Sequence, residues 1–262
     1  MRLVTWNVNS LRARKDRALA WLAKHAPDVV CLQELKGREA DLPLGEFEAA
    51  GYRVAAHGQK TYNGVAILSK SEATDIERGF PGDPEPGHSR AIAATIDGVR
   101  VLNLYVPNGQ EVGSEKYAYK LAWLAALRAH LAQIVDPARP LAVCGDFNIA
   151  PDDRDVYDVE ALRGTILCSD AEREAFTALL ATGLADGLRL KNEAPAQYTW
   201  WDYRGAMFRR GLGLRIDHVL VTPPLAARLL AVEIDLEERK GEGPSDHAPV
   251  TAVFVDRGAA SA

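Results

Sequence analysis

The sequence predicts an α/β protein in which two β-sheets pack face to face and helices cover their outer faces. Short apolar runs that end in turn residues alternate with a few segments whose apolar residues recur at helical spacing. The chain has 262 residues, of which 47% are hydrophobic, enough to bury one large core. No linker or internal repeat interrupts the pattern, so we expect one domain over 1–257 and a flexible tail at 258–262.

Nine strands and three helices account for most of the pattern. The strands are predicted at 2–6, 29–33, 52–57, 64–69, 91–96, 99–105, 141–144, 214–221 and 250–255. The helices are predicted at 12–26, 117–134 and 169–183. Asp97-Gly98 suits a two-residue hairpin turn, and Ser169 and Glu172 have the spacing of a capping box. The proline-rich 81–87 and the acid-rich 152–160 are predicted to be loops.

Composition restricts the kinds of partner. The net charge is −5, so a surface that binds phosphate must be a local basic patch or work through a metal ion. The amino terminus lacks the apolar stretch of a signal peptide and no run reaches transmembrane length, which predicts a cytoplasmic protein without membrane contact. Cys31, Cys144 and Cys168 have no paired spacing and are predicted to be reduced core residues.

The most informative strand end is at 141–151, where an apolar run changes abruptly to Gly145-Asp146-Phe147-Asn148. Asp146 and Asn148 stand two residues apart, so in extended geometry their side chains leave the same face of the strand. They offer a base and an oriented amide at a place where reacting groups often lie. Alternatively, both are ordinary turn residues that bond their own backbone.

Other predicted strands end in the same kind of polar cluster, which favours a site over turn chemistry. Glu34 follows a fully apolar strand and is suited to bind a hard cation. Asp217 interrupts another apolar run, and its carboxylate would be costly to bury without a partner such as His247. We call the shared edge on which these side chains are expected the rim; its members are Asn7, Glu34, Tyr105, Asp146, Asn148, Asp217, Asp246 and His247.

One segment combines aromatic and basic residues. Trp200, Trp201 and Tyr203 precede four arginines and no acid between Tyr203 and Ile216, at positions 204, 209, 210 and 215. Aromatic side chains beside arginines are typical of a nucleic-acid contact surface. Cations also crowd the start of the predicted helix at 12–26, which suggests an anionic ligand there or a solvated charged face.

Taken in order, these motifs resemble the exonuclease III family of abasic-site endonucleases, and most closely its bacterial exonuclease III type. The resemblance spans nearly the whole chain and rests on Trp6-Asn7-Val8-Asn9, Leu32-Gln33-Glu34, Tyr105-Val106-Pro107-Asn108-Gly109, Gly145-Asp146-Phe147-Asn148, Trp200-Trp201-Asp202-Tyr203-Arg204, Leu214-Arg215-Ile216-Asp217 and Ser245-Asp246-His247.

The resemblance implies a four-layered α/β sandwich of the endonuclease/exonuclease/phosphatase superfamily, forming one catalytic domain over 1–257. It implies Mg²⁺-dependent cleavage of the phosphodiester on the 5′ side of an abasic nucleotide, with Mn²⁺ as a substitute metal. It also implies 3′-to-5′ exonuclease and 3′-phosphatase or phosphodiesterase activity on double-stranded DNA with abasic sites or blocked 3′ ends. We expect a monomer.

The family's roles transfer by motif. Glu34 would hold the metal, with Asp246 and Asn9 nearby, while Asp146 would activate the attacking water, helped by Asn7 and Asn148. Asp217 would orient His247 at the scissile phosphate, and Tyr105 would steady the phosphate or the leaving oxygen. The DNA contacts would come from Asn108, Lys116, Trp200, Trp201, Arg204, Arg209, Arg210, Leu214 and Ile216.

A small apolar pocket can select a nucleotide without a base, because such a nucleotide costs less to extrude from the stack. Trp200, Leu214 and Ile216 could form that pocket or could be ordinary core. Some relatives carry Asp where this chain has Asn9 and Trp where it has Leu214. The number of protein ligands to the metal and the shape of the pocket therefore stay open.

Two other functions remain. Phosphatases of inositol phosphates and sphingomyelin share the superfamily, although they give no reason for the aromatic and basic stretch. A binding protein that kept the fold without catalysis would be expected to have lost some rim residues, and none is missing.

Overall fold

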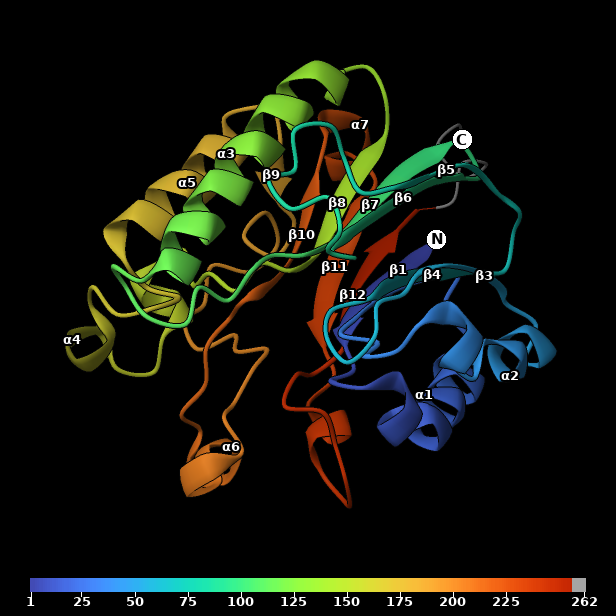
Figure 1. Cartoon of the computed structure of the whole chain (residues 1–262), viewed down its shortest axis with the longest axis horizontal. Coiled ribbons are helices and arrows are strands. Elements are labelled where there is room, and N and C mark those ends of the chain that lie inside the picture. Colours follow the sequence, from blue (N-terminus) through green and yellow to red (C-terminus); the bar gives the residue numbers. More distant parts are fainter. Residues whose placement is uncertain (256–262) are drawn as a thin grey trace.

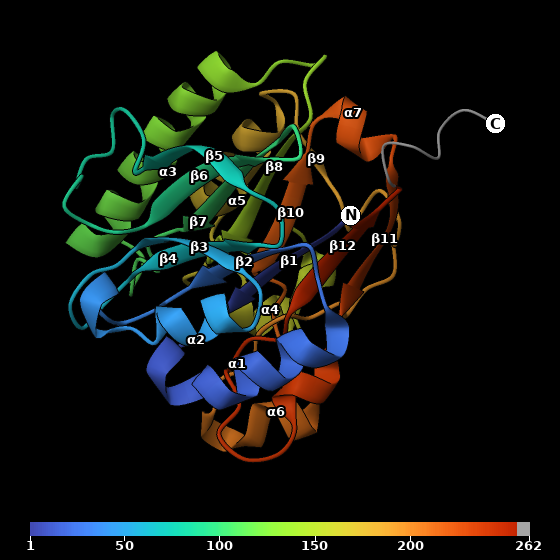
Figure 2. The same cartoon turned by 90° about the vertical axis from the view of Figure 1, so that its right-hand side faces the viewer.

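A computed structural model describes residues 1–255. Two six-stranded sheets pack face to face, with helices on the outer face of each sheet (Figures 1 and 2). Each sheet contains one parallel pair of strands among antiparallel ones. The predicted fold class, a four-layered α/β sandwich, is confirmed. The predicted end of the domain at 257 and the tail at 258–262 lie outside the described residues.

The first sheet has the strand order β11-β12-β1-β2-β4-β3. Its strands are β1 (Arg2–Asn7), β2 (Val29–Gln33), β3 (Arg53–His57), β4 (Val65–Ser69), β11 (Leu229–Ile234) and β12 (Val250–Phe254). The helices on its outer face are α1 (Leu11–His25) and α2 (Leu44–Ala49) (Figure 2). α1 is held by Trp21 and Leu22, which are buried with the outer side chains of β1, β2 and β4.

The second sheet has the strand order β5-β6-β7-β8-β10-β9. Its strands are β5 (Ala73–Arg78), β6 (Ala91–Ile96), β7 (Val99–Tyr105), β8 (Leu141–Asp146), β9 (Ala185–Asp186) and β10 (Asp217–Val221). The helices on its outer face are α3 (Glu115–Ile134) and α5 (Asp170–Leu180) (Figure 1). Short helices in the connections are α4 (Val159–Leu162), α6 (Met207–Arg210) and α7 (Pro223–Ala226).

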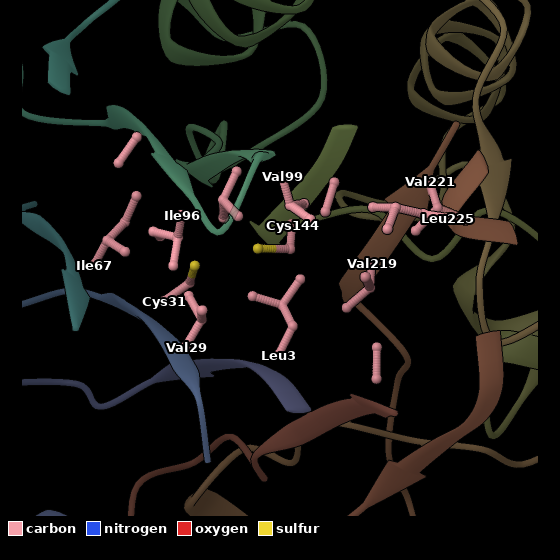
Figure 3. Close-up of a cluster of buried hydrophobic side chains, with 14 of the residues drawn as sticks. Leu3, Val29, Cys31, Ile67, Ile96, Val99, Cys144, Val219, Val221 and Leu225 are labelled. Atoms are coloured by element: carbon pink, nitrogen blue, oxygen red, sulfur yellow. The ribbon is translucent and has the colours of Figure 1, made fainter. Parts of the chain in front are cut away.

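The space between the sheets is filled by small and branched apolar side chains. Figure 3 shows part of this core, in which Leu3 and Val29 of one sheet face Val99 and Val219 of the other. The thiols of Cys31 and Cys144 lie in it, and Cys168 is also buried; all three are free, as predicted. Burial of this much apolar surface is the main force that holds the layers together.

The register of the second sheet places three predicted rim residues side by side. Asp146 at the end of β8 is paired with Tyr105 at the end of β7 and with Asp217 at the start of β10. The preceding residue must be glycine, because a Cβ at Gly145 would lie 1.9 Å from the Leu104 carbonyl oxygen. The backbone of Gly145 also has φ +146°, which L side chains rarely adopt.

The predicted hairpin and capping box are confirmed. Asp97 and Gly98 both have positive φ and join β6 to β7, and the Ser169 and Glu172 side chains close a capping box on α5. Several elements differ from prediction. The predicted strand at 214–221 begins only at Asp217, and the edge strands β5, β9 and β11 were not predicted. The loop at 152–160 contains the fully buried Asp155.

Candidate active site

The two sheets meet at the rim through Asn7, which ends β1 and is fully buried. Its Nδ2 donates hydrogen bonds to Glu34 Oε1 (2.8 Å) and to Asp146 Oδ2 (2.9 Å). Its carbonyl accepts a hydrogen bond from Ser245 Oγ (2.6 Å), which fixes the loop before β12. One amide therefore sets the spacing between a carboxylate of the first sheet and a carboxylate of the second.

Asp146 is 1% exposed, and burial raises its pKa to about 7. The positive charge of His247 opposes this rise, whereas the carboxylate of Asp217 adds to it. A carboxyl with a pKa near neutrality is suited to exchange a proton with water at physiological pH. The backbone N–H of Asn148 donates to its other oxygen, Oδ1, at 2.9 Å, which fixes the plane of the group.

His247 lies between two carboxylates. Its Nδ1 is 2.9 Å from Asp217 Oδ2, and its Nε2 is 3.7 Å from Asp146 Oδ2. Burial alone would lower the pKa of His247. The negative charges of Asp217 and Asp146 outweigh burial and raise this pKa to about 10. The imidazole is therefore cationic near neutral pH, with Nδ1–H donated to Asp217 and Nε2–H directed toward the rim.

Tyr105 lies at the same edge and keeps its proton. Burial, followed by the carboxylates of Glu34 and Asp146, raises the pKa of its phenol well above the usual value. The guanidinium of Arg90 lies 4.9 Å from the centre of the Tyr105 ring. The phenol is thus a hydrogen-bond donor held in place by its ring.

The loops after β7 and β8 are joined by an amide pair. Asn108 Nδ2 donates to Asn148 Oδ1 (2.9 Å), and Asn148 Nδ2 donates to the Val106 carbonyl (3.0 Å). Asn108 is exposed, whereas Asn148 is buried. The pair extends the rim outward from Asp146 toward the surface.

A second group of polar side chains leads from Glu34 to Asp246. The ammonium of Lys36 contacts Glu34 Oε2 (2.8 Å) and also the side-chain oxygen of Asn9. Asn9 Nδ2 donates to Asp246 Oδ1 (2.8 Å), and Trp200 Nε1 donates to Asp246 Oδ2 (3.0 Å). Burial would raise the pKa of Asp246, but His247 and these two hydrogen bonds lower it, so the group stays ionised.

Two sets of residues are candidates for a metal. Glu34, Asp146 and His247 offer ligand atoms within 4.8 Å of one another, whereas the sequence predicts Glu34, Asp246 and Asn9. His247 is a poor ligand because it is cationic and its Nδ1 is held by Asp217. Glu34 belongs to both sets. Two carboxylates and an amide oxygen are donors that suit a hard divalent cation, so the predicted residues fit a metal of that kind.

The predicted DNA-contacting residues fall into three places. Asn108 and Lys116 line a cavity of about 480 Å³ beside Tyr105, together with Arg90 and Tyr62. Trp200 contacts the rim through Asp246. The third group is exposed on a segment that projects from one end of the sandwich around α6 (Figure 1), and consists of Arg204, Arg209 and Arg210.

The remaining predicted contacts are buried. Leu214 and Ile216 are 4% and 1% exposed and pack in a small apolar cluster that also contacts Trp200. Trp201 is 4% exposed and packs against Phe208, with the Arg239 guanidinium over its ring. Trp201 therefore supports the projecting segment through its contact with Phe208.

Arg215 corrects the predicted count of four surface arginines. It is 2% exposed, and its guanidinium pairs with Asp155 (2.6 Å) and with Asp186 (2.8 Å). It therefore stabilises the interior, and three arginines remain on the surface of that segment. The cations of the first turns of α1 are also partly engaged: Arg14 donates to the Asn9 carbonyl, and Arg17 pairs with Glu238 (2.8 Å).

The main residue that sequence reasoning missed is Lys120. It is fully buried in α3 and donates to the carbonyls of Asn108 and Asn148. The buried stripe of this helix includes Lys120 and Trp123, whereas Leu121 is only partly buried and Ile134 is exposed. No local signal could have revealed it, because a lysine looks the same in the sequence whether it faces water or a buried carboxylate.

Among the described residues, no helix has both the length and the apolar character needed to cross a membrane.

Residues 4–247 match the model of the endonuclease/exonuclease/phosphatase family. The chain is 39% identical to exodeoxyribonuclease III of Haemophilus influenzae, over 97% of this chain and 100% of that protein. It is 48% identical to a 3′ phosphatase of Neisseria solved with a product DNA hairpin (TM-score 0.95, 98% and 100% covered). It is 40% identical to an AP endonuclease of Archaeoglobus fulgidus (TM-score 0.94, 98% and 100% covered). The chain therefore belongs to the endonuclease/exonuclease/phosphatase family, within which it resembles the DNA-directed nucleases.

Proposed function

We propose that this protein is a divalent-metal-dependent DNA repair nuclease that cleaves the phosphodiester 5′ to abasic sites in duplex DNA. Its further activities are 3′-to-5′ exonuclease and 3′-phosphatase or phosphodiesterase. The observation that carries the proposal is the contact of Asn7 with both Glu34 and Asp146, beside the pair of Asp217 and His247. The names of the similar proteins from Haemophilus, Neisseria and Archaeoglobus support it.

The metal is proposed to be Mg²⁺, with Mn²⁺ as a substitute. Glu34 would hold it, with Asp246 and Asn9 nearby. When bound, the ion supplies positive charge that stabilises the phosphate as negative charge develops on it. The ammonium of Lys36 contacts Glu34 Oε2 and Asn9 Oδ1, so these oxygens already face a positive charge, which a bound ion would replace.

Side chains of the rim carry out the other steps of the reaction. Asp146 accepts a proton from the attacking water while Asn7 holds its Oδ2, and Asn148 completes the alignment. His247, kept cationic by Asp217, donates a hydrogen bond from Nε2 to an oxygen of the scissile phosphate. The phenol of Tyr105 donates to the phosphate or the departing 3′ oxygen.

DNA is proposed to bind along the rim face. Asn108 and Lys116 would contact the backbone beside Tyr105, and the exposed Arg204, Arg209 and Arg210 would contact phosphates farther along the duplex. The cluster of Trp200, Leu214 and Ile216 would accept the extruded sugar, and Trp201 would hold the projecting segment through its contact with Phe208. We propose that the protein acts as a monomer.

The test is a duplex oligonucleotide with one abasic analogue, incubated with Mg²⁺ or with EDTA. We expect a nick on the 5′ side that leaves a 3′ hydroxyl, with Mg²⁺ only, and none with Asp146→Ala. Cleavage in EDTA or full activity of Asp146→Ala would contradict the proposal. Phosphate release from inositol phosphates, without nicking, would favour the phosphatase alternative, and DNA binding without any hydrolysis would favour a non-catalytic relative.

A further inference from the structure

Lys120 is an ammonium group without access to solvent. It lies on the buried face of α3, and three protein oxygens surround it: Glu172 Oε1 at 2.5 Å, the Asn148 carbonyl at 2.6 Å and the Asn108 carbonyl at 3.1 Å. An ammonium has three donors, so each of its hydrogens has a partner. Burial of a charge is tolerated only with such pairing.

The counter-ion Glu172 is equally fixed. It is fully buried in the first turn of α5, and its Oε2 accepts hydrogen bonds from the backbone N–H (3.1 Å) and the hydroxyl (2.6 Å) of Ser169. Its Oε1 also accepts the backbone N–H of Leu167 (3.1 Å). The carboxylate is thus an anchor whose position does not depend on Lys120 alone.

Both carbonyls that Lys120 binds belong to rim asparagines. Asn148 has φ +51°, a left-handed backbone that asparagine adopts more readily than most residues other than glycine. The loop that carries Asn108 lies close to the aliphatic part of the lysine side chain, because a Cβ at Gly109 would lie 3.1 Å from Lys120 Cδ. Lys120 therefore holds both loops at the point where the side chains of Asn108 and Asn148 meet.

We propose that Lys120, with Glu172 as its counter-ion, is a positioning residue for the rim, because it fixes the backbone of Asn108 and Asn148. Asn148 in turn donates its N–H to Asp146 Oδ1, so the lysine acts on the orientation of Asp146 without touching substrate. This inference rests on the proposed function. The two carbonyls that Lys120 binds come from the loops after β7 and β8, so the lysine joins the loops that carry the two rim asparagines.

The first test does not require activity. The double variant Lys120→Met/Glu172→Gln leaves no unpaired charge, so it keeps the fold where Lys120→Met alone can fail to do so. Amide hydrogen exchange should become at least about tenfold faster at Asn148 and unchanged at Cys31 in β2. Unchanged exchange at Asn148 would overturn the proposal, even if the enzyme proved to act on another substrate.

The second test separates positioning from stability. On the abasic duplex, the single-turnover rate constant of the double variant should fall about tenfold or more, and this loss should shrink below about twofold in an Asn148→Ala background. Trp21→Phe is the matched control, since it removes a partly buried hydrogen bond to the Asp235 carboxylate (2.8 Å) on the far side of the first sheet. It should lower Tm and leave the single-turnover rate constant unchanged. An equal loss in both backgrounds would overturn the proposal; no cleavage by the wild type would contradict only the proposed function.

Discussion

Asp217 sets the charge of His247, and the chemistry of the rim depends on that charge. The folded-state pKa of His247, about 10, lies above its ordinary value of 6.5, so the cation is present below about pH 10 and is lost above it. With Asp217→Asn the negative charge at 2.9 Å is removed. The alkaline limb of the kcat profile should then move to lower pH, measured between pH 7 and 11. A limb that stays in place would mean that another group titrates there.

Replacement of the reacting groups should have larger effects than replacement of their supports. Asp146→Asn and His247→Ala should each lower kcat at least ~10²-fold, the usual scale for a positioned acid or base. Arg139→Ala is the control, because Arg139 is 84% exposed and precedes the opposite end of β8. Losses below tenfold, with Tm unchanged, would show that these roles are misassigned.

Strand geometry explains which site residues could be predicted from the sequence. Asp146 and Asp217 could be found because each closes or opens an apolar strand, where a polar side chain has no reason to stand unless it is solvated or used. Lys120 and Arg215 could not, because a cation in sequence looks the same whether it faces water or a buried carboxylate. Their partners, Glu172 and Asp155, are 52 and 60 residues away in the chain.

At the scale of elements, β10 is held against its neighbours by a buried polar network. Arg215 donates to His218 Nδ1 (3.1 Å), and His218 Nε2 donates to the Ile149 carbonyl (2.9 Å). This pattern requires a neutral ring, because Nδ1 must accept. Burial and the charge of Arg215 accordingly lower the pKa of His218 to about 4.

Acid should therefore loosen this strand. Between pH 6.5 and 4 the unfolded chain binds a proton at His218 that the folded chain does not, so stability falls as pH falls through that range. A pKa difference of about 2.5 corresponds to about 3 kcal/mol. Urea unfolding from pH 7.5 to 4.5 measures it, and His218→Gln should be less stable at pH 7 but lose less on acidification. Parallel pH slopes for both proteins would contradict this assignment.

Elements with strong periodic patterns were predictable, and edge elements were not. α5 was found through its capping box, and β6 and β7 through the Asp97-Gly98 turn. β5 is largely exposed and has few apolar residues, so it lacks the alternation that marks a strand. Its pairing with β6 depends on tertiary context, which a local pattern does not contain.

At the scale of the whole molecule, this protein is acidic and is nevertheless proposed to bind DNA, a polyanion, through a small basic surface. Arg209 and Arg210 lie on the projecting α6 segment and are exposed. Each arginine that neutralises a phosphate should contribute about 0.9 to the slope of log affinity against log salt. The double variant Arg209→Ala/Arg210→Ala should weaken binding of duplex DNA and reduce this slope by about 1.8. Anisotropy titrations in EDTA measure it, and Arg139→Ala should change neither value.

The central claim is that residues distant in sequence surround one divalent cation and one phosphate at the rim. The most direct measurement is single-turnover cleavage of the abasic duplex across a Mg²⁺ titration, for the wild type and for Glu34→Gln. We expect Glu34→Gln to need at least about tenfold more Mg²⁺ for half-maximal rate, the lower end of the effects seen around metal ligands. An unchanged Mg²⁺ requirement would contradict the account, because Glu34 would then have no part in holding the ion.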